Sequence, residues 1–164
     1  MKDKYIYILS LVLTICGLAL IGFVYGTQPR SFAEIGTKGQ VVLGTYAVDQ
    51  AAFDEGLAYF KRDEFPSARA AFDRADPEKR DARTQFYIAY SYYRQGWGRV
   101  SNDDALFTSG LESVNRAIAA DPAYRAADAS LLIKTPAELK NELQEGLKVT
   151  ADDFNPLKLV RERK

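Results

Sequence analysis

Hydrophobic positions follow two different patterns along this chain of 164 residues. Residues 5–25 form one uninterrupted run that is largely apolar and carries no charge, and the next charged side chain is Arg30. As a helix rising about 1.5 Å per residue, such a run is about 31 Å long, close to the thickness of the hydrocarbon core of a bilayer. The pattern therefore predicts a single transmembrane helix over residues 5–25.

Two other interpretations of this run stay open. Leu13-Thr14-Ile15-Cys16-Gly17 partly matches a lipoprotein signal, although the bulky Ile15 stands where a small residue is expected. A cleaved secretory signal is usually shorter and ends in a small-residue cleavage site, which this run lacks. Lys2 and Lys4 precede the run, so the positive-inside rule favours a cytoplasmic N-terminus and an extracytoplasmic domain. We therefore expect a single-pass protein of the cell (inner) membrane.

One face of this predicted helix carries small or hydroxyl side chains, at Ser10, Thr14 and Gly17. Their spacing of i, i+4 and i+7 places them on one side of a helix, where small residues let a second helix approach closely in lipid. This predicts packing of the membrane helix on another helix. The alternative is that the two hydroxyl groups bond to the backbone of their own helix.

From Val48 onward the apolar residues recur three or four positions apart, as in amphipathic helices. Residues 26–47 contain four glycines and a proline, which indicates a linker with one short extended piece at Val41–Leu43. We expect five parts: an N-terminal flank (1–4), the membrane helix (5–25), the linker (26–47), a helical domain (48–148) and a basic tail (149–164). The tail suits anionic lipid or an acidic partner, or is a solvated chain end.

The helical domain divides at turn-forming residues. Two helices contain Phe53–Phe60 and Phe65–Ala75, and the second stops at Asp76-Pro77. Two more contain Phe86–Tyr93 and Phe107–Ile118, with Gly96 closing the first of them. Residues 123–133, rich in Ala and Arg, predict a fifth helix.

A sixth helix is predicted from Thr135-Pro136-Ala137-Glu138, which is a capping box with proline in the first turn. Leu139, Leu143 and Leu147 give this helix its apolar face. No alternation typical of strands occurs after Val48, so the fold class is all-α. Between the third and fourth helices, residues 97–104 form either a surface loop or a contact loop, with Ser101 or Asn102 as the helix cap.

Composition argues against catalysis. The chain has no histidine, its single cysteine is Cys16 within the apolar run, and 22 basic residues balance 22 acidic ones. Neither a G-x-G-x-x-G nor a P-loop pattern is present. We therefore expect no enzyme activity, no metal, no cofactor, no nucleic-acid partner and no small-molecule substrate.

Two helix pairs with similar spacing lie 33 residues apart, counted from Gly56 to Ala89. Each pair has a small residue followed three positions later by an aromatic residue, then small and large apolar residues in its second helix. The positions that carry this pattern are Gly56, Tyr59, Phe65, Ala68, Phe72 and Ala75, then Ala89, Tyr92, Gly96, Gly110, Val114, Ala117 and Pro122. This pattern resembles the tetratricopeptide repeat (TPR) family.

The resemblance implies a short α-solenoid of about two and a half repeats, with residues 123–133 as the half repeat and the last helix as a cap. It departs from the family at Ala52, where tryptophan is common, and in the extra residues of the 97–104 segment. The family binds partners in a concave groove, which here would be lined by Phe53, Leu57, Phe60, Lys61, Phe86, Tyr90, Tyr93, Arg94 and Trp97. The alternative is that these aromatic residues belong to the core.

Two functions fit such a chain. The first is a non-catalytic, membrane-anchored interaction module that serves as an accessory or scaffold subunit of a larger membrane protein complex. The second is a transient assembly factor that binds client peptides in the groove. Both predict other membrane proteins and the lipid bilayer as partners. Capture of a C-terminal carboxylate by a Lys/Asn pair is disfavoured, because Asp54 and Tyr87 stand near the positions that such a pair would need.

Overall fold

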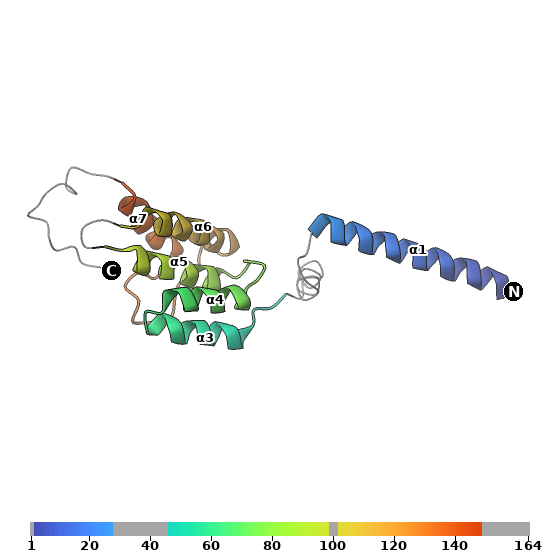
Figure 1. Ribbon diagram of the computed structural model, residues 1–164, viewed down its shortest axis with the longest axis horizontal. Helices are drawn as coiled ribbons and strands as arrows, with labels where there is room; N and C mark the ends of the chain where they lie inside the picture. Colours follow the sequence, from blue (N-terminus) through green and yellow to red (C-terminus); the bar gives the residue numbers. More distant parts are fainter. Residues whose placement is uncertain (1, 28–45, 99–101, 149–164) are drawn as a thin grey trace, which may run out of the picture. The chain divides into compact units, whose positions relative to one another are not determined.

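The computed structural model describes residues 2–27, 46–98 and 102–148, and these form six helices and no strand. The fold is therefore all-α in the part of the chain described, as the sequence predicts. The chain divides into two units, Met1–Ala47 and Val48–Lys164 (Figure 1). The predicted extended piece at Val41–Leu43 and the basic tail 149–164 lie outside the described residues.

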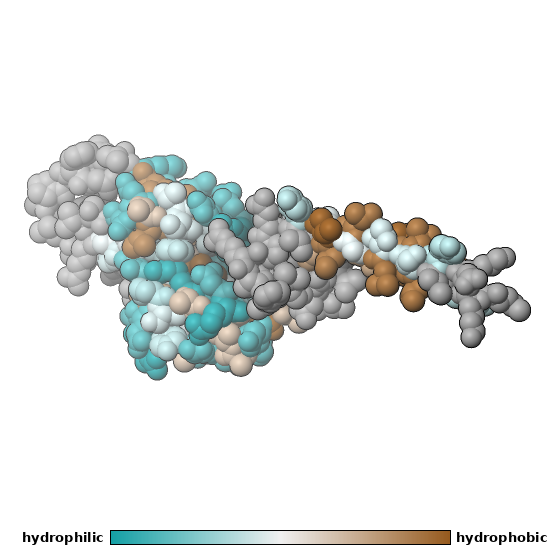
Figure 2. Space-filling model, turned by 45° about the vertical axis from the view of Figure 1, so that its right-hand side comes forward, coloured by the Kyte–Doolittle hydropathy of each residue, from teal (hydrophilic) through white to brown (hydrophobic). Residues whose placement is uncertain are grey.

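Helix α1 (Lys2–Thr27) and residues 46–47 make up the described part of the first unit. Twelve large apolar side chains of α1 are exposed, from 51% at Val12 to 80% at Tyr25, whereas Phe23 is half-buried. Figure 2 shows this helix as mainly brown, the colour of hydrophobic residues. The helical prediction for residues 5–25 is thus confirmed.

The prediction that this helix crosses a membrane is wrong. Among the described residues, no helix combines the length and the apolarity that a membrane crossing needs. A membrane crossing needs both properties over the same stretch of about 20 residues. The expectation of a single-pass protein of the cell (inner) membrane is therefore wrong as well.

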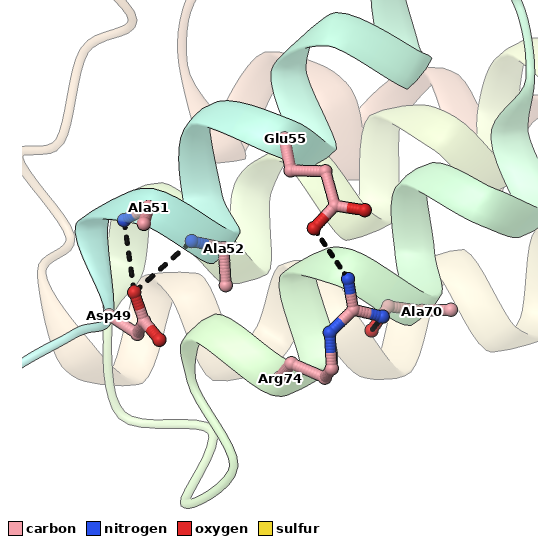
Figure 3. Close-up of polar contacts among 6 residues, drawn as sticks. All are labelled: Asp49, Ala51, Ala52, Glu55, Ala70 and Arg74. Atoms are coloured by element: carbon pink, nitrogen blue, oxygen red, sulfur yellow. Dashed lines mark hydrogen bonds and ion pairs between the residues drawn. The ribbon is translucent and has the colours of Figure 1, made fainter.

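Helices α3 (Gln50–Lys61) and α4 (Phe65–Ala75) form the first pair of the second unit. The Asp49 carboxylate caps α3 by accepting hydrogen bonds from the N–H groups of Ala51 (2.9 Å) and Ala52 (3.1 Å), as Figure 3 shows. Across the pair, Arg74 Nη2 of α4 lies 2.7 Å from Glu55 Oε2 of α3. Both helices begin and end close to where the sequence predicts.

Helices α5 (Ala82–Gly96) and α6 (Asp104–Ala120) form the second pair. Asp103 caps α6 by accepting hydrogen bonds from Ala105 N–H (3.0 Å) and Leu106 N–H (3.1 Å). The predicted cap at Asn102 is therefore wrong, and Ser101 lies outside the described residues. The Asn102 amide instead donates to the Gly146 carbonyl oxygen (2.9 Å), which ties the start of α6 to the end of the last helix.

Residues 121–135 are irregular, so the helix predicted over 123–133 is absent. Two aspartates direct the backbone into turns, because their side chains accept N–H groups that a helix would use itself. Asp121 accepts from Ala123 N–H (2.9 Å), and Asp128 accepts from Ser130 N–H (2.9 Å). Ala126 N–H donates to the Lys134 carbonyl oxygen (2.8 Å), which closes residues 126–134 into a loop.

Helix α7 (Pro136–Gly146) follows this loop and has the predicted capping box. Thr135 Oγ1 accepts the Glu138 N–H (3.2 Å), and the Glu138 carboxylate accepts the Thr135 N–H (3.2 Å). Leu139 and Leu143 are fully buried. Each helix from α3 to α7 packs on its neighbour in chain order, and α7 also contacts α5 (Figure 1).

The core of the second unit is largely aromatic. Its ring contacts cross from one helix pair to the next, with Phe53 against Tyr87 at 5.7 Å and Phe60 against Tyr90 at 5.8 Å between centroids. Tyr93 of α5 similarly lies 5.8 Å from Phe107 of α6. These rings hold α3, α5 and α6 together edge to face or tilted, the arrangements that aromatic pairs prefer.

Candidate functional site

An open groove lies on the second unit between α3, α5 and the loop 126–134. Its volume is about 580 Å³. The residues that line it are Phe60, Lys61, Tyr90, Arg94, Asp128, Ser130, Leu131 and Leu132. Half of these come from the end of α3 and the second half of α5, and half come from the loop that replaces the predicted fifth helix.

The structure brings only four of the nine predicted groove residues to this groove, namely Phe60, Lys61, Tyr90 and Arg94. Five of the nine are buried side chains of the core: Phe53, Phe60, Phe86, Tyr90 and Tyr93. Leu57 and Trp97 are partly buried and pack against the same core. The aromatic residues of α5 therefore form no exposed stripe, since neighbouring rings from α3 and α6 cover them.

Positive and negative groups in the groove differ in how far they are neutralised. Arg94 forms an ion pair with Asp63, and its side chain is 20% exposed. The Asp128 carboxylate accepts both the N–H (2.9 Å) and the hydroxyl (2.7 Å) of Ser130. These hydrogen bonds hold the pKa of Asp128 below its ordinary value. Lys61 is exposed at the end of α3, and no described carboxylate lies within ion-pair distance of it, but its charge also helps to lower the pKa of Asp128.

The groove also carries an exposed aliphatic side chain. Leu132 is 71% exposed, whereas its neighbour Leu131 is buried in the core. Among the described residues of the second unit, Leu132 is the one large hydrophobic side chain that is exposed to this degree. Single exposed leucines are ordinary on protein surfaces, so the position of Leu132 beside a groove matters more than its exposure.

The face of α1 that carries Ser10, Thr14 and Gly17 matches the alternative to packing on a second helix, in which the hydroxyl groups bond to the backbone of their own helix. Ser10 Oγ donates to the Tyr7 carbonyl oxygen (2.9 Å), and Thr14 Oγ1 donates to the Ser10 carbonyl oxygen (2.9 Å). A Cβ placed on Gly17 would meet no described atom within 4 Å outside its own helix. Both hydroxyls thus bond within their own helix, and packing of this face on another helix stays a prediction.

Two other polar residues, Asp76 and Arg69, stabilise the fold. Asp76 is fully buried and accepts hydrogen bonds from the N–H groups of Arg80 (2.9 Å) and Asp81 (3.0 Å) and from Gln85 Nε2 (3.0 Å). The Arg69 guanidinium lies 4.2 Å from the centre of the Tyr92 ring, and burial lowers its pKa. No group of three or more potential metal ligands occurs within residues 2–27, 46–98 and 102–148.

Sequence reasoning missed four residues of the groove: Asp128, Ser130, Leu131 and Leu132. All four belong to the loop 126–134, which has no apolar period of its own, and the sequence predicts a helix there. The Leu131-Leu132 pair is the one available signal, because two adjacent leucines in an irregular segment point to opposite sides of the backbone. One is buried and the other is exposed.

Comparison of the chain with protein-family models, with curated proteins and with solved structures finds no match. The resemblance to the TPR family therefore rests on the residue pattern alone.

Proposed function

We propose that this chain is a non-catalytic protein–protein interaction module, acting as an accessory or scaffold subunit of a larger protein complex. The observation that supports this most is the exposed apolar surface of α1. Leu11, Val12 and Leu13 are consecutive and each is at least 51% exposed. Neighbouring side chains on a helix point about 100° apart, so apolar groups face more than one side of α1.

Apolar surface on several sides of a helix is normally covered by other structure. Extended exposed apolar surface of this kind marks a contact site for a partner. A permanent subunit satisfies this requirement better than a transient binder does, because its apolar helix would stay covered throughout the life of the complex. This reasoning favours a lasting partner for α1.

The second unit fits the same role if its two helix pairs are TPR-like repeats. Gly56 supports this interpretation, because a Cβ there would lie 2.5 Å from the Phe72 ring, so the small residue permits a close helix crossing. Gly110 is similar, since a Cβ would lie 3.1 Å from Leu143 Cδ2. Small residues at these positions are part of the pattern that resembles the family.

A second candidate function is transient binding of client peptides during assembly of a complex. The groove beside α3 and α5 favours it, because the groove is open and combines a cation without an ion pair with an exposed leucine. The two functions are compatible in one chain, since α1 and the groove belong to different units.

The test of the subunit function changes α1 alone. We would replace Leu11 and Leu18 together by Asp in the full chain and compare sedimentation of the native protein from its own host with the unchanged chain. The expected result is that the unchanged chain sediments within a larger assembly and the double variant sediments as a single chain. Asn141→Asp combined with Gln144→Asp, which adds the same two charges at exposed positions of α7, is the matched control.

An unchanged chain that sediments alone would contradict the subunit function. So would a double variant that remains in the assembly, because α1 would then contribute no contact. Circular dichroism of both proteins checks that the helices of the second unit are intact.

A further inference from the structure

We propose that residues 123–134, here called the strap, open as one unit while helices α3 to α7 stay folded, and that this movement uncovers the aromatic surface of α5 around Phe86. The inference goes beyond both candidate functions and depends on neither. It follows from three properties of the second unit: where the hydrogen bonds of the strap run, how the strap is attached, and what holds the helices together beneath it.

The hydrogen bonds of the strap are local. Ala126 N–H donates to the Lys134 carbonyl oxygen (2.8 Å), and Leu131 N–H donates to the Asp128 carbonyl oxygen (3.4 Å). Lys134 Nζ also donates to the Asp128 carbonyl oxygen (2.9 Å). Among the described residues, no backbone–backbone hydrogen bond joins the strap to α3 or α5. The strap can therefore leave these two helices without breaking such a bond to either of them.

A few side chains attach the strap to the core. Ala126, Leu131 and Ile133 are each 4% exposed and belong to the core of the second unit. The Tyr124 ring lies 5.5 Å from the Phe86 ring of α5. Six of the twelve side chains of the strap are exposed. Segments that bury few apolar side chains open at a lower free energy than the core helices do, so the strap should open before the helices unfold.

The electrostatic contacts of Asp128 show that the strap lies close to both α3 and α5. Hydrogen bonds from Ser130 are the main reason that the pKa of Asp128 is low, and Lys61 of α3 also lowers it. Burial raises the pKa of Tyr87 of α5 to about 12, and the charge of Asp128 also raises it. Asp128 lies beyond ion-pair distance of Lys61, which is exposed. Water and salt screen such a contact, so it resists opening only weakly.

The helices beneath the strap are held together by contacts in which the strap takes no part. Phe53 packs on Tyr87 at 5.7 Å and Phe60 packs on Tyr90 at 5.8 Å, which joins α3 to α5. These ring pairs remain when the strap lifts. Phe86 is fully buried and loses the cover of the strap. The open state is therefore a rare state of the folded protein that offers aromatic surface to a partner, whereas the closed state keeps this surface covered.

Native-state thiol labelling tests the opening of the strap. Cys16 is the only cysteine of the chain and is exposed, so Cys16→Ser in the full chain gives a background in which one introduced thiol is observed. Leu131→Cys reports on the strap, Val114→Cys on fully buried α6, and Leu132→Cys on an exposed position. With Ellman's reagent under native conditions, we expect Leu132→Cys to react at once. Leu131→Cys should react at least about tenfold faster than Val114→Cys.

A second substitution separates opening of the strap from unfolding of the helices. Gly56→Ala crowds α3 against α4 in the closed and the open state alike, so it should leave the opening of the strap unchanged. We expect it to accelerate labelling at Val114→Cys by about fivefold or more and labelling at Leu131→Cys by less than about twofold. Equal labelling rates at Leu131→Cys and Val114→Cys, or the same acceleration at both, would overturn the proposal.

A second strap position covers the case in which Leu131→Cys itself loosens the strap. Ala126→Cys removes no side-chain volume from the strap, and Ala126 is as deeply buried as Leu131. If Leu131→Cys reacts as fast as Leu132→Cys, the same two comparisons are made with Ala126→Cys. Faster labelling than at Val114→Cys, without acceleration by Gly56→Ala, supports the proposal, and either opposite result contradicts it.

Discussion

The Phe72 ring occupies the space into which a side chain at Gly56 would project. An ideal Cβ on Gly56 would lie 2.5 Å from both Cδ1 and Cε1 of this ring. The glycine is buried in α3 and the phenylalanine is fully buried in α4, so neither has room to move aside. The close approach of α3 and α4 therefore depends on the absence of a side chain at position 56.

Gly56→Ala should destabilise the second unit by about 1–2 kcal/mol. Overpacking of a core costs about 1–3 kcal/mol, and the 2.5 Å approach to the Phe72 ring places Gly56→Ala at about 2–3 kcal/mol. The better helix propensity of alanine offsets about 1 kcal/mol of this cost. Urea unfolding measures the change. In a Phe72→Leu background the same substitution should cost at least about 1 kcal/mol less, and equal costs in both backgrounds would show that the ring is not the cause.

Tyr93→Ala should destabilise the protein by about 3 kcal/mol or more, because its ring is 3% exposed and packs on Tyr90 and Phe107. Leu132→Ala should change stability by less than about 0.5 kcal/mol, since its side chain is mostly in solvent. Thermal unfolding of the two variants side by side tests this difference. Similar melting temperatures would place Tyr93 outside the core.

The burial of Tyr93 and the exposure of Leu132 also show why most of the predicted groove residues belong to the core. The helical spacing of the aromatic residues shows that they share one face of α5. It does not show which other helix covers that face. Phe86 and Tyr93 are covered by rings of Tyr124 and Phe107, from segments that follow much later in the chain. Such tertiary cover has no signature in the local spacing of α5.

Asp76→Ala should destabilise the second unit by about 3 kcal/mol. The buried carboxylate accepts three hydrogen bonds that order the turn between α4 and α5, and its removal leaves two N–H groups and the Gln85 amide without this acceptor. Asp121→Ala is the control, because the exposed Asp121 accepts one N–H in a similar turn. It should cost about 1 kcal/mol or less. Chemical denaturation of both variants gives the comparison.

Turn-forming aspartates also explain the wrong helix prediction at residues 123–133. Alanine and arginine favour helix in isolation, and the sequence has several of them between Pro122 and Ile133. Asp121 and Asp128 offer the backbone competing hydrogen bonds, and the Ala126–Lys134 bond closes the loop. Helices α3 to α7 were predictable because the apolar period and the helix-breaking residues agree there. In this loop, composition and turn chemistry disagree.

The capping box of α7 should make stability depend on pH. The pKa of Glu138 is lowered, mainly because its carboxylate accepts the Lys134 N–H (3.0 Å) and also the Thr135 N–H (3.2 Å). The unfolded state therefore binds more protons than the folded state in acid. This stabilisation is present above the ordinary pKa of 4.5 and is lost as the pH falls through the folded value.

Glu138→Gln should remove this part of the pH dependence, because glutamine keeps an oxygen acceptor and cannot ionise. Urea unfolding at about pH 7 and about pH 3.5 measures the slope for both proteins. A variant with the same loss of stability in acid as the unchanged chain would assign that loss to other carboxylates.

The ring contacts between helix pairs have a consequence for how the second unit unfolds. In a simple stack of repeats, an end repeat can open while the others stay folded. Here Phe60 and Phe53 of the first pair pack on Tyr90 and Tyr87 of the second, so separating the pairs exposes aromatic surface on both. Tyr93 and Phe107 then link α5 to α6 in the same way. The second unit should therefore lose its structure in one cooperative transition, with α3 and α6 protected from hydrogen exchange to the same degree.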